Sequence, residues 1–511
     1  MKFIFSSASR TAAFGLLLTA TASCDLLQQQ SPQDFNPNDV FSTPARIDKA
    51  AVGMYDALQD GEFLGSRALV YADVRSDDVE LSPAFNNLAI SNIPSSDGSA
   101  LGAWAGGYRS MYMANYMIRE LTKRNGAGLD VAKYNQYIGE AKFIRALCHF
   151  TLVNLFAQPY NATPDASHLG VPIQLTAPDG TEAYEPAQQL PRSTVKEVYE
   201  QIIKDLTEAI AVLPETQSAG GGNDNAARAT KDAARGLLSR VYLYKGEYGN
   251  VIRTAEPIIG SGLHRLNSSA FADFLVPAEG TPNLTSESIF FIAMSQNDNP
   301  NTNAAIGQYY TPSTTISVSV TPYKNALPGP AGAAGATAAN TDRRRLDQLR
   351  FTSSQWWTRK YSKLLLNGSP GGANMGAWIP IVRYPEILLN QAEALVKNAP
   401  TFPYPATDST ALRYLNYIRN RSKPTNAPAY TLSSFTTKEA FINAILTERR
   451  FELAFEGHRL YDLFRNGLNV PAHGTAPNII PELPWKSTKA ILPIPSSEIT
   501  RNPKLVQNDA Y

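Results

Sequence analysis

The sequence predicts a mainly α-helical fold in which antiparallel helix pairs stack on one another. Apolar residues recur at steps of three and four along several long segments, as in helices that bury one face. Two consecutive segments, 230–246 and 251–260, are separated by few residues, and each ends at a glycine. A single pair of this tetratricopeptide-like kind cannot bury its own apolar face, so several pairs together predict a right-handed superhelix.

The best-defined helix pair lies over 230–260. Thr230 is placed to cap the first helix, and Gly246 is placed to end it. The second helix follows almost at once and ends at Gly260, with Pro257 expected to kink it. The segments expected to be helical are, in chain order, 43–55, 134–156, 194–213, 230–246, 251–260, 385–397, 410–421, 438–457 and a short helix through 465.

Two long stretches lack this periodicity. Residues 61–107 break into Gly, Ser, Asn and Asp clusters, so we expect long loops with brief helices there. Residues 266–377 are rich in Asn, Gly, Ser, Thr and Pro and include the low-complexity run 328–339. We expect an irregular insertion with a few short strands. Irregular runs this long are usually functional or disordered.

The N-terminal residues have the pattern of an export signal. Lys2 and Arg10 provide the positive region, residues 14–20 form a short apolar run, and small residues precede Cys24. The apolar run is too short to span a bilayer as a helix. We therefore expect a signal peptide over 1–23.

Cys24 decides between anchoring and plain secretion. Thr-Ala-Ser-Cys resembles the bacterial lipobox, whose cysteine carries lipid, although Thr21 stands where leucine is usual. The alternative is a secretory cleavage site followed by an incidental cysteine. Cys148 is the only other cysteine, so a lipidated chain has no intramolecular disulfide, and we expect Cys148 to be a small core residue. More than one acyl chain gives stable anchoring.

Composition and motifs argue for a binding protein. Forty-six Lys and Arg balance 45 Asp and Glu, so no polybasic surface predicts nucleic-acid binding. Twenty-four tyrosines favour a binding surface, because a tyrosine offers an apolar face and a polar tip. The sequence has no nucleophile elbow, phosphate loop, dinucleotide fingerprint or His-Glu-x-x-His motif. We assign no catalytic residue, no metal ligand and no cofactor.

Charged residues are densest between 448 and 459. Three glutamates fall at steps of four, which would place them on one face of the expected helix. They could form a paired-carboxylate catalytic site or a Glu/His metal site. We favour a network of Arg–Glu pairs that ties helices together, because buried charges persist when paired. The residues are Glu448, Arg449, Arg450, Glu452, Glu456, His458 and Arg459.

Several segments, in matching order along the chain, resemble the SusD/RagB family. Residues 447–465, beginning Thr-Glu-Arg-Arg-Phe-Glu, resemble its C-terminal signature. The other blocks are Arg383-Tyr-Pro-Glu-Ile-Leu-Leu-Asn-Gln-Ala-Glu-Ala, residues 415–421, residues 141–150 with Gln158-Pro-Tyr, and residues 490–495 with Asn502-Pro and Gln507-Asn. The resemblance covers nearly the whole chain.

The resemblance implies both a fold and a function. It implies about four tetratricopeptide-like pairs with a loop-rich remainder. It also implies a non-catalytic lipoprotein, facing the exterior of the outer membrane, which delivers oligosaccharides, or in some members peptides, to a TonB-dependent (SusC-like) transporter. The expected organisation is a signal peptide over 1–23, a lipidated cysteine and tether over 24–40, and one domain over 41–511, with scaffold at 41–60, 108–260 and 378–465 and ligand-side loops at 61–107 and 266–377.

Ligand contacts are expected from aromatic and polar side chains in those loops. Sugar rings stack on aromatic faces while their hydroxyls pair with polar groups, and a binding site brings both kinds together. The candidates are Trp104, Tyr71, Asp73, Arg75, Asn87, Tyr309, Tyr310, Trp356 and Trp357.

Other roles remain open for these side chains. Trp104 could pack the helix expected to begin near Gly107. One of Trp356 and Trp357 is expected to face inward. Residues 73–78 could form a solvated acidic loop or a cation site. For the whole chain, the alternatives are peptide binding, a purely structural helical-repeat adaptor and an exported hydrolase.

Overall fold

The computed structural model describes residues 37–511, except for 127, 180–181, 183–184, 219–222, 276–283, 313–315, 333, 365–369 and 404. The chain divides into two compact units, residues 1–50 and 51–511. The first unit contains α2 (Pro37–Val40) and the first residues of α3 (Pro44–Asp56), up to residue 50. The helix α3 confirms the first helix expected from the sequence. The leader, Cys24 and the expected tether up to residue 36 lie outside the described residues.

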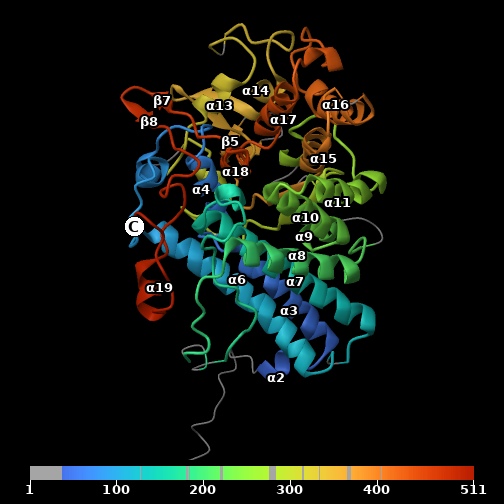
Figure 1. The fold of residues 1–511 in the computed structure, drawn as a ribbon, viewed down its shortest axis with the longest axis vertical. Coiled ribbons are helices and arrows are strands. Elements are labelled where there is room, and N and C mark those ends of the chain that lie inside the picture. Colours follow the sequence, from blue (N-terminus) through green and yellow to red (C-terminus); the bar gives the residue numbers. More distant parts are fainter. Residues whose placement is uncertain are drawn as a thin grey trace, which may run out of the picture. The chain divides into compact units, whose positions relative to one another are not determined.

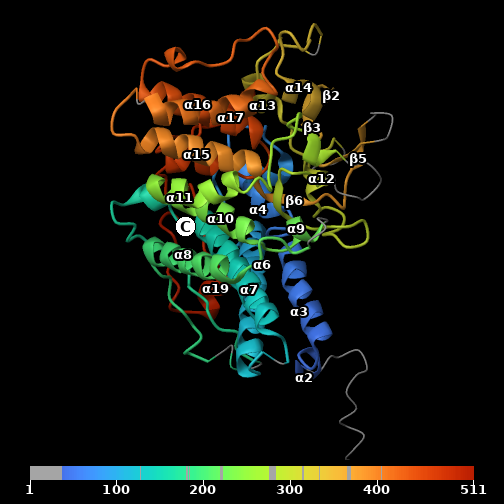
Figure 2. The same ribbon diagram turned by 90° about the vertical axis from the view of Figure 1, so that its right-hand side faces the viewer.

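The second unit is mainly helical, as predicted. Its longer helices are α6 (Gly98–Lys123), α7 (Val131–Phe156), α8 (Val195–Val212), α10 (Lys231–Lys245), α11 (Tyr248–Gly260), α15 (Tyr384–Asn398), α16 (Pro405–Asn420) and α17 (Lys438–Glu452). From α6 to α16 each packs on the next, and α17 packs on α15 (Figure 1). Figure 2 shows α16, α15, α11, α10 and α8 one above another. This succession is the helical scaffold expected from the sequence.

Helix ends follow the capping signals where these are strong. Thr194 begins α8 with a capping box, in which its side chain and that of Glu197 bond to each other's backbone N–H. The Thr230 side chain accepts a hydrogen bond from the Ala233 N–H, and Gly246 ends α10 with a φ of 78°. The helix α11 continues through Pro257.

The region expected to consist of loops over 61–107 contains more helix than predicted. It includes α4 (Arg67–Val74), and α6 begins at Gly98, where the Asp97 side chain accepts a hydrogen bond from the Ser99 N–H at 2.7 Å. The glycines of this segment indicated loops, but they serve close packing. A Cβ atom on Gly107 would lie 2.7 Å from the Leu152 side chain, so glycine allows α6 to approach α7.

The helix expected to reach Gly457 ends earlier, at Glu452. Beyond it, Phe455 has a φ of 65° and Gly457 a φ of 76°, so the backbone has left the helical region. Side chains replace the helical hydrogen bonds. Lys360 Nζ donates to the Glu452 and Ala454 carbonyls, and the Tyr361 hydroxyl donates to the Phe455 carbonyl. Glu456 therefore lies outside the helix that holds Glu448 and Glu452.

The remaining elements are short, and the few short strands expected from the sequence are present. The described residues contain four two-stranded antiparallel sheets. They pair β1 (Ser288–Ile292) with β6 (Ile379–Arg383), β2 (Leu349–Thr352) with β3 (Gln355–Thr358), β4 (Ser362–Leu364) with β5 (Pro370–Ala373), and β7 (His473–Thr475) with β8 (Asn478–Ile480). The short helices are α5 (Asn86–Ala89), α9 (Asp224–Ala227), α12 (Ile306–Tyr309), α13 (Thr321–Ala326), α14 (Arg343–Gln348), α18 (Arg459–Arg465) and α19 (Ser496–Arg501), with 3₁₀ turns η2 (Ala57–Gln59), η3 (Pro83–Phe85), η4 (Tyr160–Ala162), η6 (Ala272–Phe274) and η7 (Leu432–Ser434).

The segment 490–511 is bonded to the C-terminal end of α7. The Leu492 N–H donates to the Leu155 carbonyl at 2.8 Å. Asn508 donates to the carbonyls of Phe156 and Leu492, at 2.9 and 2.8 Å. Side chains of this segment, including Leu492 and Ile494, are buried in the core.

Candidate functional site

The three glutamates singled out in the sequence are buried and each is capped by an arginine. Burial favours the neutral acid, but Arg383 and Lys360 outweigh it and lower the pKa of Glu456 to about 2. None of the three is left as a free carboxylate for catalysis, so the interpretation as a network that ties elements together is confirmed. The shortest arginine contacts are Glu448 with Arg344 at 2.6 Å, Glu452 with Arg421 at 2.8 Å and Glu456 with Arg383 at 2.7 Å.

The acidic run 73–78 is also part of the core, and neither a solvated loop nor a cation site forms there. Asp77 pairs with Arg459 at 2.7 Å, and Asp78 pairs with Arg450 at 2.7 Å. Within the part of the chain that the structure describes, no group of three or more His, Cys, Asp and Glu side chains is arranged to hold a metal ion.

Two of the predicted ligand residues, Asp73 and Tyr310, bond to each other. The Tyr310 hydroxyl donates to Asp73 Oδ2 at 2.6 Å. Burial raises the pKa of Asp73 to about 8. Arg75, close by in sequence, is buried too, and its guanidinium donates to the Ala490 carbonyl. These three side chains hold the core together as folded.

A second group of predicted residues gathers around Phe85. The Phe85 ring lies 6.2 Å from that of Tyr71 and 5.6 Å from that of Tyr309, measured between centroids. Arg67 Nε donates to the Tyr309 hydroxyl at 2.7 Å. Both tyrosines are buried, whereas Asn87, on α5, is exposed.

The three predicted tryptophans are packed against other side chains. Trp104 lies between Tyr108 and Phe156, with ring centroids 4.9 and 5.0 Å away. Trp356 and Trp357 are 9% and 6% exposed, so both are largely buried, contrary to the expectation that one faces out. A sugar could stack on these rings only after they had moved. A ligand role for the buried candidates therefore stays a prediction that requires rearrangement, and Asn87 alone is accessible as folded.

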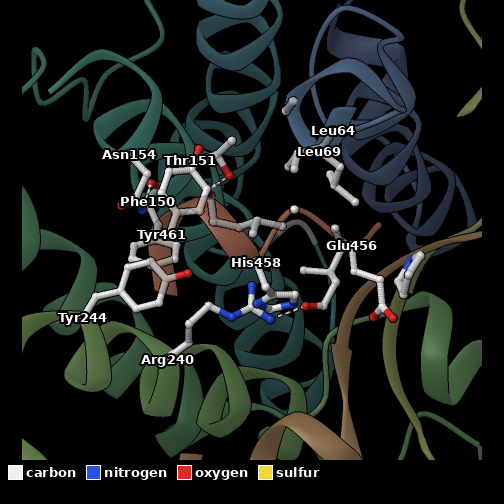
Figure 3. A pocket seen from close by; sticks show the side chains of 15 residues that line it. Leu64, Leu69, Phe150, Thr151, Asn154, Arg240, Tyr244, Glu456, His458 and Tyr461 are labelled. Carbon is white, nitrogen blue, oxygen red and sulfur yellow. Dashed lines mark hydrogen bonds between the residues drawn. The ribbon is translucent and has the colours of Figure 1, made fainter. Parts of the chain in front are cut away.

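One small cavity lies where α4, α7, α10 and residues 456–461 meet (Figure 3). Its volume is about 70 Å³, and His458, Tyr244 and Tyr461 point toward it. Burial, reinforced by Arg240, lowers the pKa of His458 to about 4, so the imidazole is neutral at pH 7. Binding pockets for small molecules occupy roughly 300 to 1,000 Å³, so this cavity has room for a few waters and not for a sugar.

A larger groove combines three tyrosines, of which Tyr417 is exposed, with two arginines, and we call it the tyrosine groove. It has a volume of about 500 Å³ and lies where the end of α11, the start of α15 and the middle of α16 meet. Tyr417 is 54% exposed, and its ring lies edge-on to that of Tyr414, with centroids 6.5 Å apart. The lining residues are Ile259, Arg265, Leu266, Tyr384, Leu388, Arg413, Tyr414 and Tyr417.

The helix α16 places its two tyrosines by simple periodicity. Its buried stripe consists of Ala411, Leu415 and Ile418. Tyr414 and Tyr417 are three residues apart, so they lie on one flank of that stripe. The predicted site missed them, because it was sought in the loops. Two tyrosines at this spacing beside the core stripe are the signal that the sequence offered.

The polar groups of the groove are available to a ligand. The hydroxyls of Tyr384, Tyr414 and Tyr417 form no hydrogen bond with any described residue, and Arg265 and Arg413 form no ion pair with one. Burial, and after it the neighbouring Tyr414 and Tyr417, raises the pKa of Tyr384. Its hydroxyl is therefore protonated at pH 7 and can donate. The groove offers aromatic faces, hydroxyls and guanidinium groups in one concavity.

Two family models match the chain and together cover most of it. Residues 25–243 match a family described as starch-binding associating with outer membrane, and residues 340–511 match the SusD family. The chain belongs to the SusD/RagB family. No helix in the described part of this SusD/RagB protein has the length and apolar character needed to cross a bilayer.

Relatives of this SusD/RagB protein are similar over nearly their whole length. SusD-like protein P2 of Formosa agariphila is 26% identical, over 97% of this chain and 98% of the relative. A SusD superfamily protein of Bacteroides vulgatus is 26% identical, with a TM-score of 0.75, over 91% of this chain and 99% of that one. A protein of the same species described as a putative sugar binding protein is 25% identical, with a TM-score of 0.71, over 91% and 98%.

Proposed function

We propose that this SusD/RagB protein is a cell-surface lipoprotein that captures oligosaccharides at the outer membrane. It then passes them unchanged to a TonB-dependent, SusC-like transporter. The proposal is supported by the family description, which associates its members with starch binding and the outer membrane, and by the structural similarity to a protein described as a putative sugar binding protein. The observation that carries it is the tyrosine groove, with its exposed Tyr417 ring.

The groove suits a sugar on chemical grounds. A pyranose ring has a flat C–H face, which packs against an aromatic ring, and Tyr414 and Tyr417 provide two such rings at an angle to each other. The sugar hydroxyls can accept from Arg265 and Arg413 and exchange hydrogen bonds with tyrosine hydroxyls. Because these groups form no hydrogen bond with a described residue, ligand binding breaks no internal hydrogen bond with that part of the protein.

The transport role rests on binding without reaction. The carboxylates that could have formed a glycosidase pair are held by arginines, with Glu456 and Glu452 paired at 2.7 and 2.8 Å. Retaining and inverting glycosidases both need two carboxyl groups that flank the scissile bond. Lipid on Cys24 would keep the protein at the membrane, where a transporter can receive its cargo.

The direct test is calorimetric titration of the purified chain carrying Cys24→Ser. The panel would contain malto-, cello-, xylo- and manno-oligosaccharides and a set of short peptides. We expect saturable binding of one glycan class and recovery of that glycan at its original length by chromatography. Saturation by peptides alone would move the protein to the peptide-binding alternative, and shortened glycan would contradict a non-catalytic role.

A further inference from the structure

A second pocket adjoins the tyrosine groove and has a different chemistry. It has a volume of about 420 Å³ and lies between the end of α8, α9, the start of α10 and the start of β1. We call it the polar pocket, because hydroxyl, amide and carboxylate side chains dominate its lining. Those side chains include Glu215, Thr216, Ser218, Asn223, Thr285 and Ser286.

Some of the polar side chains that line this pocket are available to form hydrogen bonds with a ligand. The side chains of Thr216 and Asn223 are exposed and form no hydrogen bond with a described residue. Glu215 is held by Lys231 at 3.1 Å and by Arg235 at 3.5 Å, which fixes one wall. The pocket can therefore exchange hydrogen bonds with a hydroxyl-rich molecule without disturbing that ion-paired wall.

The two cavities share one segment of chain. Leu263 and His264 line the polar pocket, and the next two residues, Arg265 and Leu266, line the tyrosine groove. His264 connects them in space as well. Its ring centroid lies 6.2 Å from that of Tyr384, in the groove, and its Nε2 lies 3.5 Å from Asp232 Oδ2, on α10.

Asp232 lies beside His264 at the boundary between the two cavities. Asp232 Oδ2 is buried and has no hydrogen-bond partner among the described residues, and His264 Nε2 lies 3.5 Å from it. Arg235 occupies the other carboxylate oxygen, at 2.9 Å. The Asp232 carboxylate thus lies between Arg235 and the His264 ring.

We propose that the tyrosine groove and the polar pocket are two subsites of one cleft, joined across residues 263–266, and that its ligand is an oligosaccharide long enough to occupy both. This inference rests on the proposed function and adds the chain length to it. The groove binds one part of the chain by ring stacking, and the pocket binds the next part through its hydroxyls.

The volumes set the expected length. Pockets of roughly 300 to 1,000 Å³ accommodate a drug-sized ligand, and a disaccharide, with about 23 non-hydrogen atoms, is of that size. Each cavity thus matches about two sugar units. A tetrasaccharide is the shortest ligand that would fill both, and further units would extend into solvent and add little.

The test compares ligand lengths on a chain whose polar pocket is blocked. Thr216 lines the polar pocket, so Thr216→Trp adds a large ring to its wall and removes no hydrogen bond with a described residue. Val131→Trp is the matched control, because Val131 is 75% exposed at the start of α7 and lines neither cavity. Di-, tetra- and hexasaccharides of the glycan class that binds the unaltered chain would be titrated by calorimetry against all three proteins, each carrying Cys24→Ser.

We expect the unaltered chain to bind the tetrasaccharide about tenfold more tightly than the disaccharide, with little further gain for the hexasaccharide. Thr216→Trp should abolish that gain and leave disaccharide affinity unchanged, while Val131→Trp should have no effect. Equal affinities for all lengths, or a gain that survives Thr216→Trp, would overturn the two-subsite cleft and leave the proposed function standing. Failure of every glycan to bind the unaltered chain would overturn both.

Discussion

The Arg383 guanidinium donates two hydrogen bonds to the Glu456 carboxylate, from Nε at 2.8 Å and from Nη2 at 2.7 Å, although the residues are 73 positions apart. Both side chains are buried, and Lys360 also donates to the same carboxylate at 2.6 Å. The pair connects the end of β6 to the turn that follows α17. It shows that the charged cluster of the sequence serves the scaffold.

Breaking this pair should destabilise the protein strongly. Arg383→Met removes the arginine partner of the buried Glu456 carboxylate. Loss of one member of a buried ion pair lowers the free energy of unfolding by about 3–5 kcal/mol. Urea denaturation would measure the loss. Arg501→Met is the matched control, since Arg501 pairs with Glu498 on the surface at 2.9 Å and should contribute less than about 1 kcal/mol. Equal losses in both variants would contradict the assigned role.

Asp73 should make stability depend on pH in the neutral range. Burial raises the folded-state pKa of Asp73 from its usual value of 3.8 to about 8. Between these two pKa values the folded protein holds a proton on Asp73 that the unfolded chain has lost. The contribution of Asp73 to the free energy of unfolding is therefore full below pH 4 and is lost as the pH rises to 8. Asp73→Asn, which stays neutral, should gain stability relative to the unaltered chain over that range, by on the order of a few kcal/mol.

Thermal unfolding between pH 4 and pH 8 would measure that difference. The same substitution at Asp509, which is exposed, is the control. A difference between Asp73→Asn and the unaltered chain that stays constant with pH would contradict a proton held by Asp73.

Tyr417 should carry much of the glycan affinity. A well-placed ring contact contributes roughly 1 kcal/mol beyond the area that it buries, so Tyr417→Ala should weaken binding about fivefold to tenfold. Calorimetry on the glycan class that binds would detect the change. Tyr112→Ala, on α6, is the control, because Tyr112 also packs against a neighbouring helical tyrosine, Tyr116, and lies outside the groove. If the two variants had the same affinity for the glycan, the tyrosine groove would not be its binding site.

Cys24 should hold the protein at the membrane. Cys24→Ser should move it from the membrane fraction to the soluble fraction and abolish labelling by a clickable fatty acid, because no acyl chain would then be attached. Cys148→Ser should stay in the membrane fraction, since Cys148 is buried in α7 and unavailable for acylation. Release of both variants, or of neither, would contradict anchoring through Cys24.

The fold could be predicted wherever local signals agree with packing. Thr230 and Gly246 bound α10 as expected, because a capping hydroxyl and a left-handed glycine act within a few residues. The start of α6 could not be predicted in this way. Gly107 suggested a loop, yet its missing side chain leaves room for Leu152, which is 45 positions away in sequence. Such a contact is visible only after the helices have packed.

The candidate site was harder to predict than the scaffold. Tyr71 and Tyr310 lie in segments whose composition indicates loops, and composition does not tell which side chains a loop region buries. Burial depends on distant partners, such as Asp73 for Tyr310. Tyr417 differs from the prediction in the opposite direction. Its helix has a clear apolar stripe and was assigned to the scaffold, yet the flank that carries Tyr417 is exposed. A helical scaffold can thus present the exposed aromatic side chain with which we propose that the ligand is bound.

The attachment of 490–511 to α7 has a consequence for the order of folding. Asn508 reaches the Phe156 carbonyl across 352 positions, and Arg75 reaches Ala490 across 415. Contacts of such long sequence separation are slow to form, because closing the intervening loop costs entropy before any contact repays it. A nascent chain that ends before residue 490 therefore leaves the end of α7 uncovered. Truncation there should trap a species that exposes Leu155 and Phe156 to proteases and chaperones.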